Sequence, residues 1–346
     1  MTQFTNDEAY QNYILPGVSR TFALTIPQLP TSLCKVVSNG YLLCRIADTI
    51  EDEPNLTPIQ KRQFSQEFTK VVAGESEPKL LSQNLYPLLS DSTLATEKDL
   101  IFNLASVIRL THSFNSTQRN ALNQCIKIMA KGMAEFQQNS SLNGLDTLAE
   151  MDRYCYYVAG VVGEMLTELF CDYSPKIAHN KKLLQHLAVS FGQALQMTNI
   201  LKDIWEDKQR GVCWLPQDIF APFELNSLTS EHYDPAFGEG LTKLITIANG
   251  HMKNALRYIL LIPASETGIR RFCLWALGMA ILTLRRILKH KDFSQSQQVK
   301  ISRRSVKATI LISNLVTRSD ISLRTLFYLL TKNIPANNYR LKNFNV

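Results

Sequence analysis

The sequence predicts an all-α protein, with one domain over residues 1–346 built as a bundle of helices around a central cavity. In long segments, for example 183–195 and 241–259, apolar residues recur at three- and four-residue spacing, which is the pattern of amphipathic helices. Proline and glycine fall between these segments, and alternating strand patterns are nearly absent. We find no Pro/Gly/Ser-rich linker, so we expect a single domain.

The composition, with 45% hydrophobic and 19% charged residues, is that of a globular protein. The seven cysteines include no CxxC pair, which argues against a disulfide framework or a zinc site and favours a reducing compartment. The first residues lack the pattern of an export signal, so we expect a cytoplasmic protein. The longest uncharged apolar stretch, 272–284, would rise about 20 Å as a helix, short of the roughly 30 Å hydrocarbon core. We therefore expect a buried helix there and no transmembrane segment.

The net charge of +7 is concentrated at the C-terminal end, where residues 300–346 contain nine Lys or Arg and a single acid, Asp320. Such a region could meet an anionic membrane surface or a phosphorylated cofactor, or it could be a solvated basic face. Peripheral membrane contact is thus one expectation. Nucleic acid is not expected as a partner, because no recognisable binding module accompanies the charge.

Two acidic clusters share one pattern, DTIED at 48–52 and DIWED at 203–207. If 41–52 is helical, Tyr41, Arg45, Asp48 and Asp52 lie within about 60° of one another on one helix face. A second helix is expected to carry four polar residues on one face in the same way: Gln196, Asn199, Asp203 and Asp207.

Both clusters interrupt segments that otherwise look core-facing, where carboxylates are unfavourable unless a cation compensates for them. Oxygen ligands on opposed helices suit Mg²⁺, which takes one or two carboxylates, keeps several waters and completes its shell with phosphate oxygens. Two such pairs facing each other in an apolar cavity imply a substrate with a diphosphate head and a hydrocarbon tail. Metal ions would neutralise the departing diphosphate, while apolar walls keep water from the carbocation. For either cluster taken singly, a solvated acidic patch is the alternative.

Four segments, in order, resemble the squalene/phytoene synthase family, and within it the squalene synthases most closely: SRTFALTIPQLP at 19–30, YLLCRIADTIED at 41–52, YCYYVAGVVGEMLTELF at 154–170 and QMTNILKDIWEDKQRGVCWLPQ at 196–217. Two later segments, FCLWALGMAILTL (272–284) and VKISRRSVKA (299–308), resemble squalene synthases more than phytoene synthases. The likeness runs from about residue 10 to 335. It implies the isoprenoid-synthase type of helical bundle.

The resemblance implies a Mg²⁺-dependent head-to-head condensation of two farnesyl diphosphates to presqualene diphosphate, followed by NADPH-dependent reductive rearrangement to squalene. Three related activities stay open: a synthase that stops at presqualene diphosphate, one that makes dehydrosqualene without NADPH, and a phytoene synthase that uses geranylgeranyl diphosphate. From another class, a non-catalytic helical scaffold is the remaining alternative. All six carboxylates of the two clusters are present, which disfavours that scaffold.

By the same resemblance, the catalytic Mg²⁺ ions would be held by Asp48, Asp52, Asp203 and Asp207, assisted by Glu51, Glu206 and Asn199. The diphosphate would be bound by residues from several segments: Ser19, Arg20, Thr21, Tyr41, Arg45, Gln196, Asn199 and Arg210. Family members commonly carry an arginine at the place of Val212, so Arg210 is the nearest possible substitute.

Tyr154 matches the tyrosine that the family uses in the first half-reaction, where a phenol near the cation could accept or relay a proton. The alternative is a core aromatic residue. Lys300 and Arg303 match positions linked to the NADPH phosphates, with Arg304 nearby, although a basic solvated tail is the competing interpretation. Membrane-anchored squalene synthases end in a hydrophobic tail, whereas this sequence ends NIPANNYRLKNFNV, so we expect any membrane contact to be peripheral.

Overall fold

The structure is a computed structural model that describes residues 6–19, 21–138 and 141–335. Every regular element within these ranges is a helix, apart from one isolated β-bridge between Leu145 and Pro216. The all-α expectation is confirmed. The chain forms two compact units: unit 1 contains Met1–Asn139 and Glu164–Lys181, and unit 2 contains Ser140–Gly163 and Lys182–Val346. We describe each unit by itself, and the single domain around a central cavity stays a prediction.

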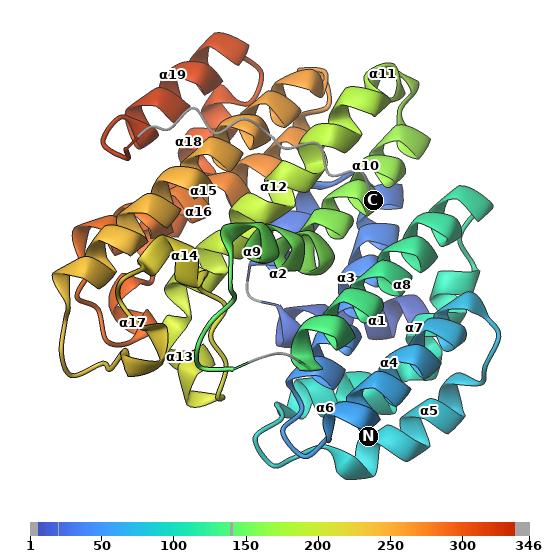
Figure 1. Ribbon diagram of the computed structural model, residues 1–346. Coiled ribbons are helices and arrows are strands. Elements are labelled where there is room, and N and C mark those ends of the chain that lie inside the picture. The colour runs from blue at the N-terminus through green and yellow to red at the C-terminus, as the bar shows by residue number, and fades with distance from the viewer. Residues whose placement is uncertain (1–5, 20, 139–140, 336–346) are drawn as a thin grey trace. The chain divides into compact units, whose positions relative to one another are not determined.

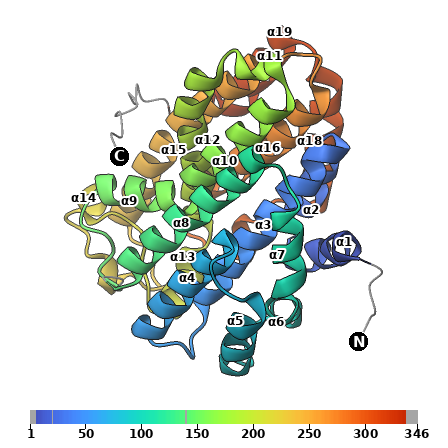
Figure 2. The same ribbon diagram turned by 90° about the vertical axis from the view of Figure 1, so that its right-hand side faces the viewer.

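Unit 1 is organised by the long helix α3, which packs against α4 and α8 (Figure 2). The buried side of α3 is formed by Leu42, Leu43, Ile46 and Ile50. The helices of this unit are α1 (Asp7–Val18), α2 (Phe22–Thr25), α3 (Thr31–Asp52), α4 (Pro58–Ala73), α5 (Pro78–Leu85), α6 (Ala95–Phe102), α7 (Leu104–His112), α8 (Ser116–Gln138), most of α10 (Val161–Tyr173) and α11 (Pro175–Ala178), with short η1 (Ile26–Gln28) and η2 (Tyr86–Leu88).

Local sequence signals set the boundaries of α4. Thr57 and Gln60 form a capping box, in which the Thr57 hydroxyl accepts from the Gln60 amide and the Gln60 side chain accepts from the Thr57 amide. At the other end Gly74 adopts φ +83°, a left-handed conformation that ends the helix. The capping box therefore fixes where α4 begins after the loop that follows α3, whose last residues carry the first acidic cluster.

Unit 2 is organised by the long helices α15 and α16, which pack side by side and carry α18 and α19 (Figure 1). Its helices are α9 (Leu148–Cys155), the start of α10, α12 (Lys181–Lys202), α13 (Ile204–Gln209), α14 (Gln217–Phe220), α15 (Pro235–Leu261), α16 (Thr267–Lys289), α17 (Ser296–Val299), α18 (Arg303–Val316) and α19 (Asp320–Thr331), with a π-helical turn η3 (Tyr156–Gly160) and η4 (Leu225–Ser227). The helices predicted over 183–195 and 241–259 are confirmed as parts of α12 and α15.

The apolar stretch 272–284 lies within α16, and most of its side chains are buried, as expected. Across the part of the chain that the structure describes, none of the helices combines the length and the apolar character that crossing a membrane requires.

Helix α12 and the segment from α9 to α10 approach each other closely within unit 2. A Cβ atom on Gly192 would lie 2.2 Å from the carbonyl oxygen of Ala159, and one on Gly163 would lie 2.4 Å from that of Ala188. No real side-chain carbon tolerates such distances, so both positions require glycine. This contact holds the helix that carries Tyr154 against the helix that leads into the second acidic cluster.

The buried side chain of Arg270 connects the C-terminal helices of unit 2 to α15 and α16. Its Nε donates to the carbonyl oxygen of Ile262, at 2.8 Å, just after α15. Its Nη1 donates to the carbonyl oxygen of Thr317, at 3.1 Å, and to Asp320 Oδ1, at 2.8 Å. Because burying a guanidinium is unfavourable unless it is fully hydrogen-bonded, these contacts fix where α19 begins.

Candidate active site

Arg45 is the centre of the first acidic cluster, at the end of α3. Its Nη2 donates to the Tyr41 hydroxyl at 3.0 Å, and its Nη1 forms longer ion pairs with Asp48 (3.7 Å) and Glu97 (3.8 Å). Burial disfavours its charge, but the carboxylate of Asp48 more than offsets this, so the pKa of Arg45 is raised. Within the described residues, Arg45 Nε is buried and has no hydrogen-bond partner. A permanently charged donor is thus left available beside the carboxylates.

The predicted face of α3 is confirmed, because a continuous helix runs from Thr31 to Asp52 and carries Tyr41, Arg45 and Asp48 at the expected spacing. Asp52 is exposed at its last position. This part of the site could therefore be predicted from helical periodicity.

Burial and, after it, carboxylate crowding disfavour ionisation at the end of α3. Burial, followed by the charge of Asp52, raises the pKa of Asp48 to about 6 against the influence of Arg45. Burial and the charges of Asp52 and Asp48 raise the pKa of Glu51 to about 8. Glu51 is itself buried and accepts a 3.3 Å hydrogen bond from Gln137 of α8. A cation at this position would relieve the repulsion that these shifts express.

Ser19 and Thr21, which are predicted to bind diphosphate, lie in the chain between two residues that contact Tyr41. The Tyr41 hydroxyl donates to the carbonyl oxygen of Val18 at 3.0 Å, and its ring lies 5.3 Å from that of Phe22. Ser19 is buried and its hydroxyl accepts from the Phe22 amide at 2.9 Å. Thr21 precedes α2 and is exposed. The prediction for Arg20 lies outside the described residues.

Two glutamates near this cluster are not among the residues that the sequence predicts for the site. Glu97 of α6 pairs with Arg45, and burial together with Asp52 raises its pKa despite that pairing. Glu53 is buried after the end of α3 and accepts from the amide of Ser90 (3.1 Å) and the hydroxyl of Thr93 (2.6 Å). The two hydrogen bonds of Glu53 join segments some 40 residues apart, and the ion pair of Glu97 joins segments about 50 residues apart. No local sequence pattern indicates these contacts.

The second acidic cluster differs from the expectation of one continuous helix. Helix α12 ends at Lys202 and α13 begins at Ile204, while Asp203 adopts φ −100° and ψ 16°. This backbone region is sparsely populated and recurs at active sites. The amide of Asp203 still donates to the Asn199 carbonyl, and that of Asp207 to the Asp203 carbonyl, both at 2.9 Å. The helical register therefore continues through the bend, although the helix does not.

Basic side chains pair with both aspartates of the second cluster. Lys202 Nζ lies 3.0 Å from Asp203 Oδ2 and donates to Asn199 Oδ1 at 3.4 Å. Arg210 Nη2 donates to Asp207 Oδ1 in a close contact. Arg210 thus lies at the cluster, three residues after Asp207 and directly before the turn at Gly211. Gln196 lies on α12, half-buried, two turns before the bend.

Glu206 presents an oxygen that nothing in the described residues satisfies. Its Oε1 accepts from the Ser296 amide at 3.3 Å, whereas its Oε2 is buried without a hydrogen-bond partner. Lys300, just after α17, lies close enough to lower the pKa of Asp203. The net shift of Asp203 is upward, because burial and the charge of Glu206 outweigh Lys202 and Lys300. Of the three predicted NADPH residues, Lys300 is therefore beside this cluster, while Arg303 and Arg304 are exposed at the start of α18.

Tyr154 lies buried on α9, and its ring stacks on the indole of Trp214 with centroids 4.0 Å apart and planes 9° apart. The π-helical turn η3 follows it directly, a feature frequent at functional sites. Trp214 follows the second cluster by seven residues and was not predicted to be part of the site.

The donors of both clusters fit Mg²⁺ by their chemistry, since hard carboxylate oxygens are its preferred protein ligands. The unsatisfied Glu206 Oε2 and the crowded carboxylates of α3 are the features that a cation would compensate. In the described part of the chain, no three His, Cys, Asp or Glu side chains converge on one metal position. A bound Mg²⁺ would complete its shell with waters and substrate oxygens.

A sequence profile described as squalene/phytoene synthase matches residues 15–305. The chain belongs to this family. It is 28% identical to the squalene synthase of Eremothecium gossypii over 87% of its length, and 29% identical to that of Schizosaccharomyces pombe over 95%. It spans 66% and 70% of those two relatives, and 58% of the Botryococcus braunii protein named squalene synthase BSS, to which it is 30% identical over 80% of its own length. The resemblance stated from the motifs is confirmed.

Solved structures show the same fold. The complex of TcSQS with the ligand BPH1237 aligns with a TM-score of 0.73 and 21% identity, covering 96% of this chain and 94% of that one. A ligand complex of a dehydrosqualene synthase aligns with a TM-score of 0.62 and 21% identity, covering 88% of this chain and 94% of the other. These similarities support the all-α fold.

Proposed function

We propose that this family member is a squalene synthase: a Mg²⁺-dependent prenyltransferase that joins two farnesyl diphosphates head to head and then reduces the product with NADPH. The observation that carries the proposal is the arrangement around Arg45, where an unpaired guanidinium N–H lies beside carboxylates whose pKa values are raised. A diphosphate bridged to metal ions needs both kinds of group, an anion-binding donor and metal-binding carboxylates.

In the first half-reaction, one farnesyl diphosphate loses its diphosphate to give an allylic cation, and the double bond of the second attacks it. Loss of a proton then closes the cyclopropane of presqualene diphosphate. Mg²⁺ would supply charge neutralisation at the departing diphosphate. Asp48, Asp52, Asp203 and Asp207 are proposed to hold it, with Glu51, Glu206 and Asn199 assisting. Arg45 and Tyr41 are proposed to donate to the diphosphate oxygens together with Ser19, Arg20, Thr21, Gln196 and Arg210.

Tyr154 is the residue proposed to handle the proton of that step. Its ring is fixed by the stack on Trp214, so the phenol oxygen has little positional freedom. A fixed phenol suits proton transfer, which depends on geometry first and on pKa second. A packing role for Tyr154 is the competing interpretation, and a substitution separates the two in the Discussion.

In the second half-reaction, presqualene diphosphate loses its diphosphate, the cation rearranges, and hydride from NADPH gives squalene and NADP⁺. Lys300, Arg303 and Arg304 are proposed to bind the phosphates of NADPH. The position of Lys300 beside the second acidic cluster supports this role more directly than the exposed positions of the two arginines. Synthesis of presqualene diphosphate or dehydrosqualene without NADPH, and of phytoene from geranylgeranyl diphosphate, are the neighbouring activities.

One experiment separates these activities. Purified protein is incubated with farnesyl diphosphate and Mg²⁺, with and without NADPH, and in parallel with geranylgeranyl diphosphate, and the extracted products are identified by mass spectrometry. We expect squalene only when farnesyl diphosphate and NADPH are both present. A product that NADPH leaves unchanged would exclude squalene synthase, and phytoene as the main product would reassign the substrate.

The proposed product is strongly hydrophobic and the substrate carries a farnesyl chain, so peripheral contact of the basic C-terminal region with a membrane surface is proposed beyond the two farnesyl diphosphates. A cytoplasmic location facing such a surface stays a prediction.

A further inference from the structure

Helices α18 and α19 expose large apolar side chains to solvent, on the sides that do not pack against the rest of unit 2. On α18, Leu311 is 63% exposed and Leu315 77%. On α19, Ile321 is 79%, Tyr328 65% and Leu329 51% exposed. We call these five residues the outer apolar set. Single exposed apolar residues are common on any protein, but five on two adjacent helices indicate a surface that contacts a partner.

The opposite sides of the same helices are packed. Ser313 of α18 is buried, as are Leu323 and Phe327 of α19, and both helices contact α16 and each other. These contacts define which side faces the core of unit 2. The outer apolar set therefore cannot be explained as core residues of this unit.

On each helix, a basic residue shares a face with members of the outer apolar set. At 100° per residue, Arg304, Leu311 and Leu315 lie within about 40° of one another on α18. On α19, Ile321, Arg324 and Tyr328 lie within about 60°. The exposed sides thus combine apolar side chains with long cationic ones, the composition of helices that lie in the interface of a membrane.

The charge of this region is almost entirely positive. Residues 300–335 contain seven basic residues, Lys300, Arg303, Arg304, Lys307, Arg318, Arg324 and Lys332. The one acid among them, Asp320, is paired with Arg270. A second copy of this chain would bring like charges together across a two-fold interface, which disfavours self-association through this surface.

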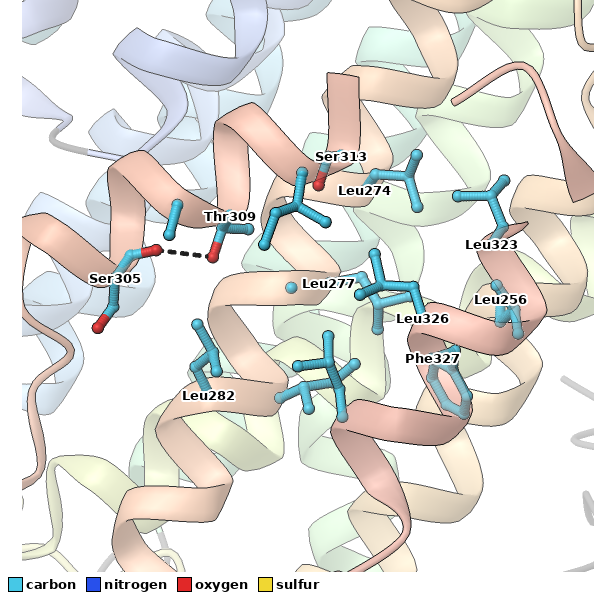
Figure 3. A pocket seen from close by; sticks show the side chains of 15 residues that line it. Leu256, Leu274, Leu277, Leu282, Ser305, Thr309, Ser313, Leu323, Leu326 and Phe327 are labelled. Atoms are coloured by element: carbon cyan, nitrogen blue, oxygen red, sulfur yellow. Dashed lines mark hydrogen bonds between the residues drawn. The ribbon is translucent and has the colours of Figure 1, made fainter. Parts of the chain in front are cut away.

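An apolar cavity of about 220 Å³ lies between α16, α18 and α19, with one lining residue from α15 (Figure 3). Leu274 and Leu277 line it from α16, Leu323 and Phe327 from α19. Its polar contribution comes from α18, where the Thr309 hydroxyl is already bonded to the Ser305 carbonyl oxygen at 2.9 Å. Ile312 lines the cavity and is also 42% exposed, so it connects the cavity to the outer surface.

We propose that α18 and α19 form a surface that docks on an anionic lipid bilayer. The outer apolar set enters the region between headgroups and acyl chains, and Lys307, Arg318 and Arg324 approach the anionic headgroups. A bilayer fits better than an acidic protein, because hydrocarbon chains adapt to scattered apolar side chains and to an apolar cavity without requiring matched polar partners. This surface does not depend on the proposed reaction, so the two proposals can fail separately.

The test measures by co-sedimentation how the full chain partitions onto vesicles. One set of vesicles is neutral phosphatidylcholine, and the other contains about 30% of the anionic lipid phosphatidylglycerol. We expect binding to the anionic vesicles that weakens strongly as salt rises from low to high concentration. Equal binding to neutral vesicles, or none to either, would overturn the proposal.

Two triple variants separate the contributions of charge and apolar surface. The first variant combines Lys307→Gln, Arg318→Gln and Arg324→Gln. Because each basic residue near an anionic surface contributes about 1 kcal/mol, we expect partition to fall at least about 100-fold. Leu311→Ser, Leu315→Ser and Ile321→Ser together should lower it at least about 10-fold. The matched controls change exposed residues of the same types elsewhere: Lys79→Gln with Lys182→Gln, and Ile59→Ser with Leu94→Ser. Circular dichroism and thermal unfolding check that all variants fold.

A fluorescence reporter tests insertion directly. Tyr328→Trp should shift its emission to the blue on anionic vesicles and be quenched by brominated acyl chains, whereas Tyr173→Trp, on α10, should do neither. If the serine triple variant binds like wild type, the contact is electrostatic adsorption only and insertion is wrong. If light scattering shows a dimer that the serine triple variant abolishes, the partner is a second copy and the bilayer proposal is wrong.

Discussion

Tyr154 and Trp214 stack face to face, with ring centroids 4.0 Å apart and planes inclined by 9°. The two residues come from different segments of unit 2, one from α9 and the other from the turn after the second acidic cluster. The stack therefore ties the proposed proton-handling residue to the segment that carries Asp207 and Arg210.

Replacing Tyr154 by phenylalanine separates chemistry from packing. The variant Tyr154→Phe keeps the stack and loses only the hydroxyl. We expect presqualene diphosphate formation to fall by about 10²-fold or more, the scale of general acid–base catalysis, with little change in thermal unfolding. Tyr173→Phe, at an exposed position, is the control. A rate like that of wild type would leave Tyr154 with a packing role.

Removing one charge from either acidic cluster should slow ionisation of the diphosphate. We expect Asp48→Asn and Asp203→Asn each to lower turnover of farnesyl diphosphate by about 10²-fold or more, because electrostatic stabilisation in a water-poor site has that magnitude. The Mg²⁺ concentration needed for half-maximal activity should also rise. Asp91→Asn, in an exposed turn, should change neither quantity. Full turnover in both cluster variants would show that neither carboxylate is needed for ionisation, and would contradict the proposed metal-binding role of the clusters.

A buried polar network in unit 2 predicts a pH dependence of stability. His251 shares a 2.7 Å hydrogen bond with the Ser190 hydroxyl, which also accepts from Asn254 at 3.1 Å. Burial lowers the pKa of His251 from 6.5 to about 4, so the unfolded chain takes up a proton that the folded one excludes. The stabilising effect is complete above pH 6.5 and is lost as the pH falls towards 4.

The variant His251→Gln should remove this pH dependence. Between pH 6.5 and 4, the unfolding free energy of the wild type should fall by about 3 kcal/mol more than that of the variant, as measured by urea denaturation at several pH values. The slope is the readout, since the substitution also changes stability at neutral pH. Parallel pH profiles for the two proteins would show that His251 does not titrate in this range.

Arg270 is predicted to be far more important to stability than a surface arginine. Arg270→Met removes three hydrogen bonds and leaves two buried carbonyl groups unsatisfied, so we expect the unfolding free energy to fall by about 3 kcal/mol or more. Arg109 is the matched control, because it pairs with Asp7 at 2.6 Å but is 58% exposed. Arg109→Met should lower stability by less than about 1 kcal/mol. Similar losses for the two variants would contradict the role given to burial.

The parts of the fold and site that the sequence could predict are those set by local pattern. Periodicity places Tyr41, Arg45 and Asp48 on one face of α3, and it identifies α12, α15 and the buried stretch of α16. The bend at Asp203 could not be predicted, because the helical register continues across it and no Gly or Pro marks it. The same is true of the π-helical turn after Tyr154.

Contacts between segments that are distant in the sequence could not be predicted. Glu97 reaches Arg45 from a helix about fifty residues later, and Trp214 reaches Tyr154 across about sixty. Such pairings depend on how helices pack, which a single sequence does not specify. That the two acidic clusters act on one diphosphate also concerns the packing of distant segments, and it stays a prediction.

The position of Arg270 limits how far the chain can be shortened. Any version that stops before residue 317 would keep the guanidinium in the interior. It would discard the Thr317 carbonyl that accepts from it and the Asp320 carboxylate that neutralises it. Deleting α18 and α19 would thus leave a buried cation in unit 2 without its carboxylate partner. A truncation that spares the fold has to begin beyond residue 320, so the proposed lipid-docking surface is best removed by substitution.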